Sequence, residues 1–153
     1  MFWRPIFSQK PARLKPRRSI RLDNDMKIGM TTTIPVEAIL AAGHTPVDLN
    51  NIFITSPEAA SMVADAESDG YPRTACAIKG IYSAALREEI QTVVAVTQGD
   101  CAQTHAMIET LSEAGVRIIP FAYPYDRDEE LLRAQIQRLC DHLEVSWEEA
   151  EGQ

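Results

Sequence analysis

The chain has 153 residues and a mass of 17.0 kDa, and 45% of its residues are apolar. That is enough for one domain with a core, and it excludes a wholly disordered chain. No apolar run approaches the roughly 20 residues of a membrane span. Three cysteines are too few for a disulfide scaffold, which favours a reducing, cytoplasmic setting.

The first 25 residues carry a net charge of +5 and the whole chain −7, so residues 26–153 carry −12. Nucleic acid is therefore an unfavourable partner for this acidic part.

Residues 1–25 are predicted to be a disordered basic extension. They show no hydrophobic period, and Pro5, Pro11 and Pro16 would interrupt a helix. The interpretation we favour is a start codon placed too far upstream, with Met26 as the natural beginning. A mitochondrial transit peptide and a basic tail that binds a polyanion are the alternatives.

From residue 27 the sequence alternates between strand and helix patterns. The predicted strands are 27–30, 45–49, 92–96 and 116–121. The predicted helices are 35–42, 56–68, 77–89, 103–114 and 126–143, the last with Asp126 as N-cap and Glu129 as its capping-box partner. This alternation predicts a Rossmann-like α/β domain over 26–145, with a mostly parallel sheet of about four strands and helices on both faces.

Ligands of such sheets bind at the carboxyl ends of the strands. The turns expected at that edge are 31–33, 50–51, 97–101 and 122–126. Neither a GxGxxG nor a GxxxxGK[ST] motif is present, so nucleotide binding has no support from a motif. Tyr123 and Tyr125 either line a pocket at this edge or pack the loop. Ser146 and Glu149 have the form of a capping box, so 146–153 is interpreted as the start of a truncated helix, with a frayed acidic tail as the alternative.

Cys76 and Cys101 are the candidate reactive thiols. Cys76 leads into a helix near Arg73 and Lys79, and Cys101 follows the clearest strand. Helix N-termini and nearby cations stabilise the thiolate, which is the form that binds soft metals and iron–sulfur clusters. Their separation of 25 residues matches no standard ferredoxin or zinc pattern, so buried or incidental cysteines are the alternative interpretation.

The other candidate ligands are weaker. Cys140 falls on the apolar face of a predicted helix, where a small buried side chain is expected. Cys101 and His105 are four residues apart and, on a helix, would share a face. Together with Cys76 they would supply three ligands for a zinc ion, which is a further alternative.

Six segments are long enough to compare with known families: KIGMTTTIPVE (27–37), TPVDLNN (45–51), YPRTAC (71–76), KGIY (79–82), VTQGDC (96–101) and IPFAYPYDRD (119–128). In this order they resemble the N-terminal half of 2-hydroxyacyl-CoA dehydratase D-component proteins, a family that includes 2-hydroxyglutaryl-CoA dehydratase and benzoyl-CoA reductase subunits. The resemblance covers essentially all of 26–145. The fold it implies is Rossmann-like and incomplete here relative to the family.

The resemblance implies an iron–sulfur component that holds a [4Fe–4S] cluster through three cysteines. Cys76 matches the first family cysteine and Cys101 the second, while the third lies in a C-terminal half that this chain lacks. In the family, an ATP-dependent activator protein delivers one electron, and the acyl-CoA substrate loses water as a radical by syn elimination. The implied partners are that activator, the acyl-CoA, and a second dehydratase subunit or the missing half. The residues expected to contact substrate are Thr32, Asn51, Lys79, His105 and Tyr125.

Two interpretations follow from the missing third cysteine. In the first, the chain is part of a lyase or acyl-CoA reductase and is inactive alone. In the second, it is a non-catalytic cluster-carrying or assembly subunit, or a truncated remnant, and needs a partner chain. CoA is a polyanion, and an acidic domain gives no direct support for binding it.

Overall fold

The computed structural model describes residues 25–153, so the predicted extension lies, apart from Asp25, outside the described residues. Four strands, β1 (Lys27–Met30), β2 (Thr45–Asp48), β3 (Thr92–Gln98) and β4 (Arg117–Ala122), form one parallel sheet. Their order in the sheet is β2-β1-β3-β4. Within these residues, no helix is both long and apolar enough to cross a membrane.

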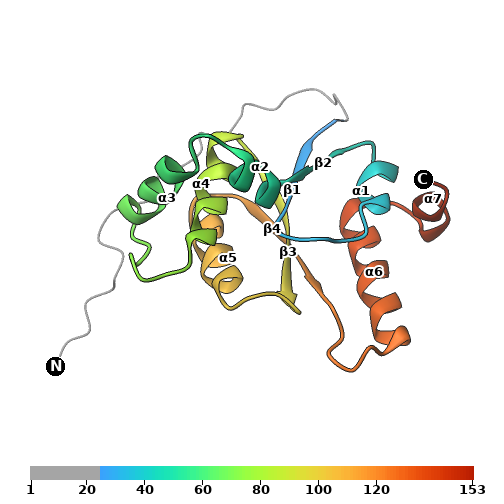
Figure 1. Ribbon diagram of the computed structural model, residues 1–153. Coiled ribbons are helices and arrows are strands. Elements are labelled where there is room, and N and C mark those ends of the chain that lie inside the picture. The colour runs from blue at the N-terminus through green and yellow to red at the C-terminus, as the bar shows by residue number, and fades with distance from the viewer. Residues whose placement is uncertain (1–24) are drawn as a thin grey trace.

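The helices lie in two layers, one on each face of the sheet (Figure 1). They are α1 (Glu37–Ala41), α2 (Leu49–Thr55), α3 (Ala59–Ser68), the 3-10 turn η1 (Ala77–Lys79), α4 (Gly80–Arg87), α5 (Gln103–Glu113), α6 (Glu129–Leu143) and α7 (Trp147–Glu151). One face is covered by α2 to α5 and the other by α1, α6 and α7. The predicted Rossmann-like α/β architecture is confirmed.

The central strand β3 belongs to both cores. Val93 and Ala95 pack under α2 to α5, whereas Val94 and Val96 pack under α1, α6 and α7. All four are buried, because successive side chains of a strand point to opposite faces and both faces are covered. The β-branched residues that dominate 92–96 in the sequence therefore have a direct structural cause.

Each outer strand contains a proline, Pro46 in β2 and Pro120 in β4. Proline cannot donate a backbone hydrogen bond, so in sheets it is confined to outer strands, strand starts and bulges. Their position agrees with the observed strand order.

The prediction of a turn at Asn50 and Asn51 was wrong, and the sequence analysis missed α2. The Asp48 carboxylate accepts a hydrogen bond from Asn51 N at 2.9 Å and caps a helix that begins at Leu49. Because this cap is the last residue of β2, strand and helix join without a loop. The strand predicted at 45–49 therefore ends at Asp48, one residue earlier than expected.

The N-cap predicted at Asp126 was also wrong. The cap is Asp128, whose carboxylate accepts from Leu131 N at 3.0 Å. Arg127 has a φ of 60° and closes a turn onto the Pro124 carbonyl oxygen, so helical geometry cannot begin before it. Glu129 instead pairs with Arg133 one turn later. The capping box of Ser146 and Glu149 is confirmed.

A tyrosine joins α5 to the segment after α3. Tyr71 is 6% exposed, and its hydroxyl is hydrogen-bonded to Thr110 Oγ1. Thr110 in turn donates to the Ala106 carbonyl oxygen at 3.0 Å. Burial raises the pKa of Tyr71 to about 12, because the ionised phenolate would lose its hydration.

This raised pKa predicts a loss of stability in alkali that Tyr71→Phe should reduce. Above pH 10 the unfolded chain releases the phenolic proton while the folded chain keeps it until about pH 12. Stability is thus fully present below pH 10 and falls as the pH rises toward 12, by up to about 3 kcal/mol for this group. Urea unfolding between pH 9 and 11.5 should give a shallower decline for Tyr71→Phe, and parallel curves would contradict the assignment.

Candidate functional site

The loops at the carboxyl edge of the sheet are tied to one another. Thr31 follows β1, and its Oγ1 accepts from Val96 N of β3 at 3.3 Å. Tyr123 follows β4, and its hydroxyl donates to the Thr33 carbonyl oxygen at 2.8 Å. The ring of Tyr123 also lies against Gly99, which follows β3 and has a φ of 94°. The three loops therefore form one continuous surface.

Cys101 lies in the loop between β3 and α5, and an aspartate fixes its backbone. Asp100 accepts from Cys101 N through Oδ1 at 2.7 Å and from Thr104 Oγ1 through Oδ2 at 3.0 Å. Thr104 is buried, so the carboxylate links the loop to the first turn of α5. Cys101 itself is exposed. Its partner Asp100 was not singled out from the sequence, although an aspartate before a helix is a common capping residue.

Cys76 lies immediately before η1 and is also exposed. Its carbonyl oxygen accepts from Lys79 N at 3.1 Å, which closes the 3-10 turn. η1 contacts α5, so the two thiols stand at the beginnings of neighbouring elements. In Figure 1 the segment before α4 and the loop before α5 both lie toward the end to which the β3 arrow points.

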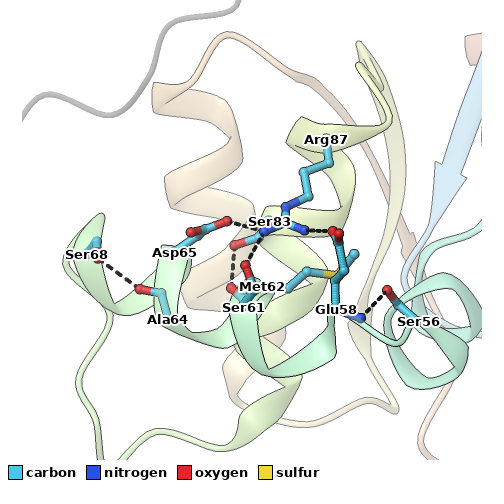
Figure 2. Close-up of polar contacts among 9 residues, drawn as sticks. All are labelled: Ser56, Glu58, Ser61, Met62, Ala64, Asp65, Ser68, Ser83 and Arg87. Carbon is cyan, nitrogen blue, oxygen red and sulfur yellow. Dashed lines mark hydrogen bonds and ion pairs between the residues drawn. The ribbon is translucent and has the colours of Figure 1, made fainter.

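An arginine fastens the far end of the α3–α4 hairpin that carries Cys76. Arg87 donates to Glu58 and Asp65 of the α3 region, at 2.6 Å each, and to Ser61 Oγ at 2.7 Å (Figure 2). Next to it, Ser83 Oγ donates to the Met62 carbonyl oxygen at 2.7 Å. These contacts hold α3 and α4 together along their length.

The residues expected to contact substrate differ in their exposure. Thr32 is half-buried in the loop after β1, and Asn51 is exposed in the first turn of α2. His105 is exposed on α5, and Tyr125 is 94% exposed after β4. Lys79 is buried, with its ammonium group facing the protein.

Of the two tyrosines that the sequence placed at this edge, Tyr123 packs the loop. Its ring meets the ring of Phe121 edge to face, with centroids 5.0 Å apart. Burial raises the pKa of Tyr123. Tyr125 points outward and packs against little of the described protein.

Cys76, Cys101 and His105 do not assemble a zinc site. Across residues 25–153, no three His, Cys, Asp or Glu side chains are gathered to hold a metal ion. Cys101 precedes α5, which begins at Gln103, so the helical spacing that would align it with His105 does not apply. Cys140 is completely buried in the core under α6, as predicted, and burial raises the pKa of its thiol.

One cavity lies away from Cys76 and Cys101. It measures about 450 Å³ and lies at the amino edge of the sheet, between the strand starts and the end of α6. Its polar lining includes His44, Thr92, Arg117, His142 and Glu149, and none of the candidate site residues borders it. The candidate functional site is therefore defined by the two exposed thiols and by the loops at the carboxyl edge of the sheet, because the size of a cavity does not by itself indicate a reaction.

Residues 31–149 match the family model described as 2-hydroxyglutaryl-CoA dehydratase, D-component. The chain belongs to this family. The match includes both exposed cysteines, α1 to α6 and the first residues of α7, and it confirms the resemblance drawn from the sequence segments. No curated protein and no solved structure matches the chain. Cys76 and Cys101 are the two cysteines of this D-component chain whose side chains are exposed to solvent.

Proposed function

We propose that this D-component chain is an iron–sulfur component of a 2-hydroxyacyl-CoA dehydratase-like enzyme. The observation that carries the proposal is the pair Cys76 and Cys101. Both thiols are exposed on neighbouring elements, inside the region that matches the family. Thiolates are the ligands that [4Fe–4S] clusters take in proteins, so the donor chemistry fits.

The number of donors sets a condition on this proposal. The described residues offer two exposed thiols, and Cys140 lies in the core. A cluster at Cys76 and Cys101 would therefore take its remaining protein ligand from outside residues 25–153, either from a further segment or from a second subunit. When bound, the cluster supplies one-electron chemistry toward an acyl-CoA, with an ATP-dependent activator as the electron donor.

The chain's own residues hold the two ligands and shape the surface around them. Asp100 fixes the backbone at Cys101 through two hydrogen bonds. Thr32, His105 and the exposed Tyr125 are the groups we propose for substrate contact at this edge, with Asn51 at the end of β2. Both thiols are exposed to solvent, so the acyl-CoA reaches them from outside the protein.

The first test is the iron and acid-labile sulfide content after anoxic purification. Wild-type protein, together with the segment or subunit that supplies the remaining ligand, should hold both, and Cys76→Ser and Cys101→Ser should each lose them because serine is a poor ligand for this cluster. Cys140→Ala is the matched control: it removes the buried thiol, costs some stability, and should keep iron and sulfide.

Two outcomes would contradict the proposal. One is wild-type protein without iron or sulfide even after reconstitution together with a partner subunit. The other is iron retained in both serine variants. Iron and sulfide without turnover of any acyl-CoA would favour the second candidate, a cluster-carrying or assembly subunit, which the two-thiol donor set equally supports.

A further inference from the structure

Lys79 is the one buried side chain with a formal charge among the described residues, at 2% exposure. Moving an ammonium group out of water costs several kcal/mol unless it is paired and hydrogen-bonded. A chain keeps such a group only where its contacts compensate for that cost. Those contacts all lie in the segment that leads to Cys76.

The ammonium group of Lys79 uses its whole hydrogen-bonding capacity. Nζ lies 2.8 Å from Glu67 Oε1, 2.9 Å from the Pro72 carbonyl oxygen and 3.3 Å from the Arg73 carbonyl oxygen. An ammonium group has three N–H donors and no acceptor, so three partners saturate it. No donor remains for a substrate.

The three acceptors define a closed loop. Glu67 is in the last turn of α3, while Pro72 and Arg73 lie between α3 and η1. The Lys79 side chain therefore ties the end of α3 and the middle of the connection to the start of α4. A backbone hydrogen bond, from Lys79 N to the Cys76 carbonyl oxygen at 3.1 Å, fixes the position of the cysteine relative to Lys79.

From this geometry we infer that Lys79 is a positioning residue for Cys76 and not a substrate contact. It acts through the loop: its ammonium group joins two carbonyl oxygens and one carboxylate of the connection, and it adds to the hydrogen bond from Ala75 N to the Pro72 carbonyl oxygen at 3.0 Å and to the Arg73–Glu67 ion pair at 3.7 Å. The inference deepens the proposed function, because its consequence for iron binding rests on Cys76 being a cluster ligand.

The test uses Lys79→Met, which keeps the length of the side chain and removes its charge and donors. Arg73 is 92% exposed in its side chain and marks a trypsin cleavage point inside the loop. We expect cleavage after Arg73 to become at least tenfold faster in Lys79→Met under native conditions. The iodoacetamide reaction rate of Cys76 should change by threefold or more, with that of Cys101 in the same chain unchanged.

Three further variants separate a local effect from a general one. Lys27→Met removes a lysine from an exposed ion pair, with Glu88 at 3.0 Å, and should leave both rates as in wild type. Ile119→Ala destabilises the core on the other face of the sheet and should not accelerate cleavage after Arg73 selectively. Glu67→Gln keeps an oxygen acceptor and should fall between wild type and Lys79→Met, so the inference stays testable if Lys79→Met does not fold.

Iron content distinguishes failure of this inference from failure of the proposed function. If wild-type protein holds a cluster, Lys79→Met should lose most of its iron while Lys27→Met keeps it. If wild-type protein holds none, the proposed function fails, and cleavage and alkylation still decide the role of Lys79. The inference would be overturned if Lys79→Met and Glu67→Gln were both cleaved after Arg73 at the wild-type rate and if their Cys76 also reacted with iodoacetamide at the wild-type rate.

Discussion

Gly80→Ala should destabilise the protein by about 3 kcal/mol, a large effect for adding one methyl group. A Cβ at residue 80 would lie 2.6 Å from Cδ2 and 2.9 Å from Cζ of Phe53, with Cε2 nearer still. These separations are shorter than real carbon contacts. Phe53 is buried in α2, so its ring has little room to turn away. Glycine at the start of α4 thus lets α2 and α4 approach.

The midpoint of urea unfolding measures this effect. Gly152→Ala is the control, because a Cβ there would meet nothing nearer than 3.5 Å and should change stability by less than about 1 kcal/mol. Adding Phe53→Leu to Gly80→Ala should recover part of the loss, since the ring that obstructs the methyl group is gone. A Gly80→Ala protein as stable as Gly152→Ala would refute the close packing of α2 on α4.

Phe121→Ala should cost about 3 to 5 kcal/mol, the range for truncating a buried aromatic side chain. Phe121 is 1% exposed in β4 and packs in the core under α1 and α6. It also supports the ring of Tyr123, which it meets at an interplanar angle of 79°. The variant should therefore lose stability and also loosen the loop that follows β4.

Phe121→Leu separates these two contributions. It keeps most of the buried volume, so its cost should stay near 1 to 2 kcal/mol. A double-mutant cycle with Tyr123→Leu should show a coupling of about 1 kcal/mol for the ring pair. Equal unfolding midpoints for Phe121→Ala and wild type would show that β4 is not packed as described.

The sequence predicted the sheet well because its central strand β3 is buried on both faces. The apolar run at 92–96 and the helical period of α5 and α6 follow directly from that burial. The prediction that Cys140 is buried also held, because the helical spacing of apolar residues around it decided it. Each of these features is set by residues close together in the chain.

The errors arose where a short polar side chain could start a helix at more than one place. Asp48 caps α2 directly at the end of a strand, and Asp128 rather than Asp126 caps α6. Both choices depend on tertiary packing that no local pattern specifies. The burial of Lys79 could not be predicted either, because its partner Glu67 is twelve residues away and its burial depends on how α3 and α4 pack.

The prolines of the outer strands bear on how the protein behaves at high concentration. Exposed strand edges are templates for pairing with another copy, and Pro46 and Pro120 each remove a backbone donor from such an edge. Both edges of the sheet are thereby discouraged from forming intermolecular ladders. Any contact with a further chain would accordingly fall on helices and loops, whose side chains can distinguish one partner from another.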